Sequence, residues 1–163
     1  MTTPSLAPDA SLHGSAVAFP GPGGPCAVLI LGPSGAGKST LALALTACGG
    51  TLVADDRVRL RAAGGRVLLS APAALRGLVE ARGVGVLRVP NLPHAPLALV
   101  LDLADGDADR LPPQRSIRLL GRRFERMIPP VNGDAADLAP ALAARLRAGG
   151  GRVDPAPPGP EGR

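Results

Sequence analysis

The residues best suited to chemistry form one short stretch, Gly32-Pro33-Ser34-Gly35-Ala36-Gly37-Lys38-Ser39-Thr40. Its spacing fits the pattern G-x-x-x-x-G-K-[ST], which describes a loop whose backbone N–H groups surround a phosphate chain. In such a loop the lysine reaches the β- and γ-phosphates, and the hydroxyl that follows it can bind Mg²⁺. The stretch therefore predicts a nucleotide-phosphate site with a magnesium position at Ser39.

The flanking sequence supplies the strand and the helix that position such a loop. Residues 26–31 are an apolar run of strand length, and residues 41–47 have the character of a buried helix. The N-terminus of that helix would face the bound anion. Lys38 is the only lysine among 18 lysine and arginine residues, and its compact ammonium fits between phosphates better than a planar guanidinium. The order of these features disfavours the alternative, a glycine-rich turn that binds nothing.

An acidic pair, Asp55-Asp56, follows the apolar residues 51–54. In phosphate-loop folds an acid at the end of a neighbouring strand holds Mg²⁺, often through water. Adjacent side chains point in different directions, so one acid can serve the metal while the other accepts a proton from an attacking hydroxyl. An ordinary Asp-Asp surface turn is the competing interpretation.

Glu80 is one of only three glutamates, and it lies in the glycine-punctuated stretch 77–86 together with Arg82. A carboxylate and a guanidinium flanked by glycines indicate a backbone packed close to something else. Residue type and spacing leave two alternatives open, a ligand site and a structural ion pair within a turn.

Composition limits the kinds of partner. The net charge is +5, but the chain has only two aromatic residues, Phe19 and Phe124, and no long basic run. Without a stacking platform, nucleic acid is not an expected partner. Cys26 and Cys48 are isolated, as expected of free thiols in a reducing compartment. No apolar run reaches membrane-spanning length and no signal peptide is evident, so we expect a cytoplasmic protein without a membrane partner.

The 163 residues suffice for one domain with a substantial core. We expect a flexible tail over residues 1–11, one domain over 12–148, and a disordered tail rich in glycine and proline over 149–163. Helices are expected at residues 41–47 and 134–148, with one helical turn or a loop at 71–76. Strands are expected at residues 15–19, 26–31, 51–54, 57–62, 66–69, 97–103, 116–120 and 123–128.

The order of these features resembles the catalytic domain of the HPr kinase/phosphorylase family. The resemblance lies in Leu52-Val53-Ala54-Asp55-Asp56-Arg57-Val58, in the stretch 77–86 that matches the family's signature, in His13-Gly14 and in Asp109-Arg110. It covers the chain from about Leu12 to Arg110. It implies an α/β fold, a P-loop-containing kinase domain with a mixed sheet of the PEP-carboxykinase-like type.

The resemblance also implies roles for individual residues. Lys38 and the loop 32–40 would hold the phosphates of ATP, while Mg²⁺ would lie near Ser39, Asp55 and Glu80. Asp56 would be the base for a target serine, Arg110 would steady the transferred phosphoryl group, and His13 would lie beside the site. The implied activity is phosphorylation of a serine on an HPr-type phosphocarrier protein by a homo-oligomer, typically a hexamer in this family.

The sequence also departs from the family pattern. The chain has no room for the additional N-terminal domain of longer members, so it resembles the short form that has the catalytic domain alone. Pro33 stands where the family usually has an acidic residue. Residues 129–134 contain no arginine, whereas the family's corresponding segment, important for phosphorolysis, does. We therefore expect phosphorolysis to be weak. A small-molecule P-loop kinase and a non-catalytic nucleotide-binding regulatory module remain the alternatives.

Overall fold

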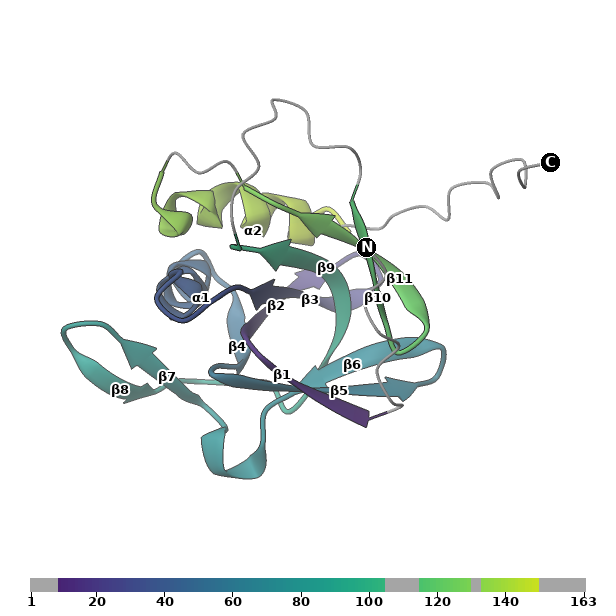
Figure 1. Ribbon diagram of the computed structural model, residues 1–163, viewed down its shortest axis with the longest axis horizontal. Helices are drawn as coiled ribbons and strands as arrows, with labels where there is room; N and C mark the ends of the chain where they lie inside the picture. The colour runs from purple at the N-terminus through teal and green to yellow at the C-terminus, as the bar shows by residue number, and fades with distance from the viewer. Residues whose placement is uncertain (1–8, 105–114, 130–132, 150–163) are drawn as a thin grey trace.

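Strand β3 (Gly24–Leu31) lies at the centre of the main sheet, between β2 (Ser15–Gly21) and β9 (Ala95–Asp102). It pairs antiparallel with β2 and parallel with β9. Its apolar residues 27–30 are fully buried, as expected for a strand covered on both faces. This is a computed structural model, and it describes residues 9–104, 115–129 and 133–149 (Figure 1).

The main sheet has nine strands in the order β1-β5-β6-β9-β3-β2-β4, with β10 and β11 joined beside β9. The remaining strands of this sheet are β1 (Asp9–His13), β4 (Thr51–Ala54), β5 (Arg57–Ala63), β6 (Arg66–Ser70), β10 (Ser116–Leu119) and β11 (Arg122–Met127). The parallel β3–β9 and β9–β11 pairs lie among antiparallel neighbours, so the sheet is mixed, as the sequence predicts.

Two helices, α1 (Lys38–Ala47) and α2 (Ala139–Arg147), pack on one side of the central strands (Figure 1). The side chains of the central strands pack alternately into two hydrophobic cores, one on each face of the sheet, because successive side chains of a strand point to opposite faces. Val28 and Ile30 pack with the helices, whereas Ala27 and Leu29 pack against β5, β6 and the other side of the curled sheet. No helix within the described residues is long and apolar enough to cross a membrane.

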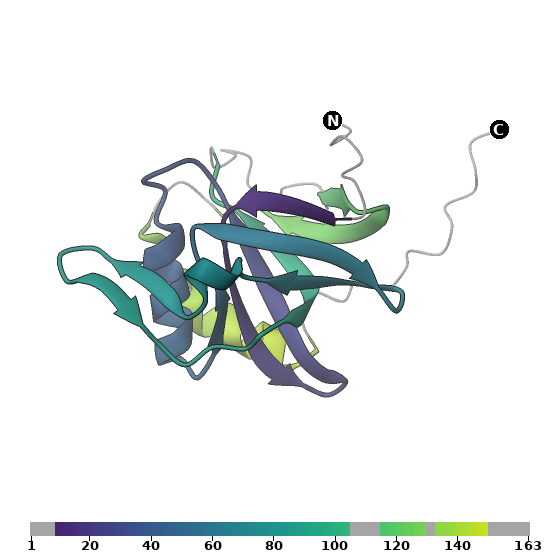
Figure 2. The same ribbon diagram turned by 90° about the horizontal axis from the view of Figure 1, so that it is seen from below.

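A separate two-stranded hairpin, β7 (Leu78–Ala81) and β8 (Gly85–Arg88), extends from the body beside α1 (Figures 1 and 2). It follows the 3₁₀ turn η1 (Ala73–Leu75). Val79 of the hairpin is buried against the helix-side core. This contact fixes the base of the hairpin, and with it Glu80, next to the phosphate loop.

The structure corrects predicted boundaries near both ends of the described chain. Residues 9–11, expected to belong to a flexible tail, instead lie in β1, because Asp9–His13 pair with β5 as an edge strand. The helix expected over residues 134–148 begins as a 3₁₀ turn, η2 (Ala135–Leu138), and α2 starts only at Ala139. The Asp134 side chain caps this segment by accepting a hydrogen bond from the Ala136 N–H. Residues 1–8 and 150–163, which make up most of the two expected tails, and Arg110 lie outside the described residues.

Candidate active site

The phosphate loop connects the end of β3 to the start of α1. Gly32 has a φ of 149°, and a Cβ there would lie 3.0 Å from the Leu103 Cβ, so glycine is needed for this close approach. Lys38 is buried, and its Nζ donates hydrogen bonds to the carbonyl oxygens of Gly32 (2.8 Å) and Pro33 (2.9 Å). The ammonium is therefore held inside the loop, close to where phosphates would bind.

Asp55 is the most highly connected side chain of the site, and only 4% of its surface is exposed. Its carboxylate accepts hydrogen bonds from the hydroxyls of Ser15 (2.6 Å) and Ser39 (2.9 Å to each oxygen). The backbone N–H of Glu80 donates a further bond of 3.2 Å. One carboxylate thus joins β2, α1 and the hairpin at a single point.

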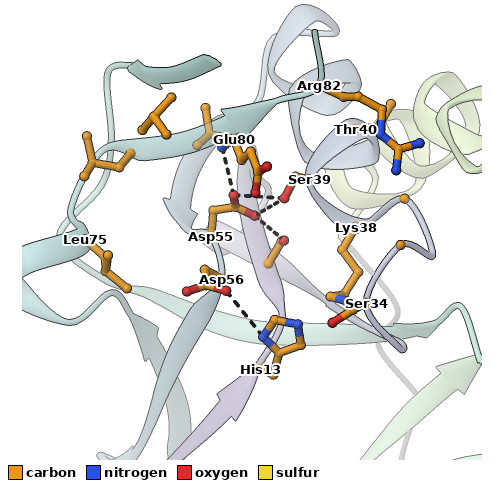
Figure 3. A pocket seen from close by; sticks show the side chains of 16 residues that line it. His13, Ser34, Lys38, Ser39, Thr40, Asp55, Asp56, Leu75, Glu80 and Arg82 are labelled. Atoms are coloured by element: carbon orange, nitrogen blue, oxygen red, sulfur yellow. Dashed lines mark hydrogen bonds and ion pairs between the residues drawn. The ribbon is translucent and has the colours of Figure 1, made fainter. Parts of the chain in front are cut away.

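Asp56 points away from Asp55 toward His13 (Figure 3). An Asp56 carboxylate oxygen lies 3.5 Å from Nδ1 of His13, and both side chains are substantially exposed. The backbone at Asp56 has a φ of 67°, and the Arg57 N–H donates to the Asp55 carbonyl at 2.8 Å. This pattern is a γ-turn centred on Asp56, and it separates the two neighbouring carboxylates.

Gly14 explains why His13 is brought to this place. Its N–H donates to the Asp56 carbonyl at 3.2 Å, which ties the chain after β1 to the γ-turn. A Cβ on Gly14 would lie only 2.6 Å from the Ile30 carbonyl oxygen. Only glycine permits this close contact with β3, so the His13-Gly14 pair positions the imidazole beside Asp56.

A cavity of about 550 Å³ brings most of the predicted residues together. The predicted residues that line it are His13, Ser34, Gly35, Gly37, Lys38, Ser39, Thr40, Asp55, Asp56 and Glu80. Gly32, Pro33 and Ala36 belong to the loop but do not line the cavity. Arg82, which the sequence analysis considered together with Glu80, also lines the cavity. Sequence reasoning assigned no individual role to the remaining lining residues, Ser15, Leu75, Leu78, Val79 and Val86.

Ser15 is the most informative of the residues that sequence reasoning missed. It is fully buried at the start of an otherwise apolar strand, and its hydroxyl donates to Asp55. A polar residue that opens an apolar strand was the available signal. The apolar wall of the cavity was not predicted because its residues come from η1 and the hairpin, whose position depends on tertiary packing.

The oxygen ligands suit Mg²⁺ better than a transition metal. Ser39 contacts Asp55, and the Glu80 side chain points toward this contact (Figure 3). Within the part of the chain that the structure describes, no group of three or more His, Cys, Asp or Glu side chains forms a metal cluster. Mg²⁺ typically takes one or two carboxylates and completes its shell with water and substrate phosphates. Two acids and one hydroxyl fit that requirement.

The fold and the site define an α/β domain of the P-loop class with an acidic pair facing the loop. Comparison with known proteins narrows the class further. The family model described as HPr Serine kinase C-terminal domain matches residues 4–94, more than half of the chain. The chain belongs to this family.

Curated relatives named HPr kinase/phosphorylase include one from Exiguobacterium sp., 40% identical over 114 residues, which are 65% of this chain and 35% of the relative. Another, from Geobacillus thermodenitrificans, is 38% identical over 130 residues, 75% of this chain and 39% of the relative. The chain thus spans about a third of the length of the curated relatives it matches.

Among solved structures, the Hpr(Ser) kinase/phosphatase from Coxiella burnetii matches with a TM-score of 0.67 and 21% identity. The match covers 84% of this chain and 93% of that chain. This likeness confirms the fold, an α/β domain with a mixed sheet.

Proposed function

We propose that the chain is an ATP-dependent serine kinase whose acceptor is an HPr-type phosphocarrier protein. One observation carries the proposal: two adjacent carboxylates occupy different positions in one cavity with Lys38. Asp55 is fixed against Ser39, whereas Asp56 is exposed beside His13. This separation suits a metal-side acid and a proton-accepting base in the same site.

Each side chain has a task in this mechanism. Lys38 moves its donors from the carbonyl oxygens of the loop to the phosphates and offsets their charge. Asp56 accepts the proton of the acceptor serine as its oxygen attacks the terminal phosphorus in line. The imidazole of His13 holds the Asp56 carboxylate in position.

Ser39, Asp55 and Glu80 would hold Mg²⁺ in this proposal. The metal, when bound, neutralises negative charge on the phosphates. Asp55 has a second task, because its bonds to Ser15 and Ser39 keep the ligand side chains oriented. Arg110, for which the family resemblance implies contact with the transferred phosphoryl group, completes the proposed set.

Two alternatives make different predictions. A small-molecule P-loop kinase would transfer phosphate to a low-molecular-weight alcohol rather than to a protein. A non-catalytic module would bind nucleotide equally well with or without the Asp56 carboxylate, and it would transfer no phosphate from the bound nucleotide.

Incubation with γ-labelled ATP, Mg²⁺ and a purified HPr-type protein tests the proposal. We expect an acid-stable phosphoserine on the acceptor, and its loss in Asp56→Asn with nucleotide binding retained. Label on small alcohols alone would favour the first alternative, and binding without any transfer would favour the second.

Light scattering of the same sample tests the homo-oligomer that the family resemblance implies, with a monomer as the contradicting result.

A further inference from the structure

Strand β5 has a row of arginines that the proposed reaction does not use. Arg57, Arg59 and Arg61 occupy alternate positions of this strand, and all three side chains are exposed. The residues between them, Val58 and Leu60, are fully buried in the core. The alternation places the three guanidinium groups on one outer face, which we call the basic row.

The basic row begins at the mouth of the candidate active site. Arg57 directly follows Asp56, and its cross-strand partner on β1 is His13, which lines the cavity. The row then runs outward along β5, with Ser11 opposite Arg59 and Asp9 opposite Arg61. A macromolecule that contacts the row would therefore also lie over the cavity.

Little negative charge on the described part of the chain offsets the row. Asp9 lies 3.8 Å from Arg59, and both side chains are more than half exposed, so this pair is screened by solvent. Arg57 and Arg61 have no ion-pair partner among the described residues. On the other side of β5, the residues facing Arg59 and Arg61 are the neutral Ser70 and Leu68.

We infer that the basic row is a docking surface for an acidic segment of the acceptor protein, next to the serine that is phosphorylated. This inference rests on the proposed kinase function. Guanidinium groups at every second residue of a strand repeat every ~6.8 Å, the same repeat as alternate side chains of an extended acceptor segment. Arginine forms paired hydrogen bonds with carboxylates, so carboxylates at that spacing match the row in charge and in geometry.

Nucleic acid fits the row less well than an acidic protein does. Non-specific binding of single strands combines positive charge with aromatic side chains on which bases stack. Neither Phe19 nor Phe124 lies on β1, β5 or β6.

Charge reversal at one position of the row tests the inference. In Arg61→Glu we expect the KM for the HPr-type acceptor to rise about five-fold, and in Arg59→Glu/Arg61→Glu more than ten-fold. The kcat and the affinity for ATP should stay unchanged, because neither residue lines the cavity. Arg118→Glu is the matched control, since it makes the same charge change at an exposed position of β10.

A binding measurement separates this inference from the kinase proposal. The probes are two serine peptides, one with alternating aspartates and one with asparagines at the same positions. Fluorescence anisotropy measures the binding of each peptide to the protein. We expect only the acidic peptide to bind the wild-type protein, with weaker binding in added salt and in Arg61→Glu. Absence of transfer to any acceptor, with this binding intact, would refute the kinase function alone.

The inference is overturned if Arg61→Glu and Arg118→Glu change KM and peptide affinity equally, or if neither changes them. It is also overturned if a single-stranded oligonucleotide binds the row more tightly than the acidic peptide and is released by Arg61→Glu. Both single substitutions lie at exposed strand positions, so we expect both variants to fold. Urea denaturation checks this, and their unfolding midpoints should equal that of the wild type.

Discussion

Ser39 donates to both carboxylate oxygens of Asp55, at 2.9 Å each, and this contact joins helix α1 to the end of β4. Asp55 is therefore a structural residue as well as a candidate magnesium ligand. An acid that only bound metal would leave the fold unchanged when replaced. This one fixes three elements through a single buried carboxylate.

Replacement of Asp55 by asparagine should consequently lower stability. The amide offers one acceptor oxygen where the carboxylate offers two, and its NH₂ faces donors. We expect Asp55→Asn to lose about 1–3 kcal/mol in the free energy of unfolding, measured by urea denaturation. Asp56→Asn, at an exposed position, is the control and should unfold like the wild type. Equal stability of the two variants would contradict the structural role.

Lys38 is the subject of the second prediction. Lys38→Ala should abolish phosphoryl transfer and weaken ATP binding, because the chain has no second lysine and the buried position admits no other cation readily. Titration with a fluorescent ATP analogue measures the binding. Lys38→Arg keeps the charge but not the compact head group, so we expect it to be inactive too. Normal activity of Lys38→Ala would show that the loop is not the phosphate site, and normal activity of Lys38→Arg would show that the compact ammonium is not required.

The proposed roles of Asp56 and Glu80 can be distinguished by measuring kcat and the Mg²⁺ dependence of the rate in the same variants. Asp56→Asn is expected to keep nucleotide affinity and lose kcat, since an amide nitrogen does not accept a proton. Glu80→Gln is expected to raise the Mg²⁺ concentration needed for half-maximal rate. A near-normal kcat for Asp56→Asn would remove Asp56 from the role of base.

Sequence reasoning succeeded where local pattern determines structure. The apolar run before the phosphate loop, the buried helix after it and the alternating residues 57–62 all have a clear local pattern, and the strands and helix form there. It failed at β1, whose polar edge residues resemble a tail, and at the hairpin, whose glycines hide the strand pattern. Ser15 was missed because its partner, Asp55, is 40 residues away.

Gly14 offers a test of how tightly the site is built. The methyl group of Gly14→Ala would meet the Ile30 carbonyl oxygen at 2.6 Å, so we expect a loss of about 1–3 kcal/mol in unfolding free energy. Gly23→Ala is the matched control, because a Cβ there meets nothing within 4 Å. A smaller effect at Gly14 than at Gly23 would show that the backbone at Gly14 is not held closely against β3.

The last prediction concerns the reverse reaction, phosphorolysis of the phosphoserine by inorganic phosphate. Two unit charges ~4 Å apart repel by about 4 kcal/mol at an effective dielectric near 20, so added cations must offset the repulsion. Residues 129–134 carry no arginine and include Asp134. We therefore expect pyrophosphate formation from serine-phosphorylated HPr to be much slower than the forward reaction.

Comparable forward and reverse rates would contradict this prediction. Such a result would direct attention to Arg122, Arg123 and Arg126 on β11. Of these, Arg126 already lies 3.0 Å from the Asp102 carboxylate, a contact that limits its availability for a phosphate ion.

The γ-turn at Asp56 has a consequence for engineering this chain. A non-glycine residue with positive φ carries backbone strain, and glycine would relieve it. A search for stabilised variants, made without an activity screen, would therefore favour the loss of the proposed base. Under the proposed mechanism, thermal robustness and phosphoryl transfer would be opposed at this one position, and directed evolution for heat resistance would have to hold Asp56 fixed.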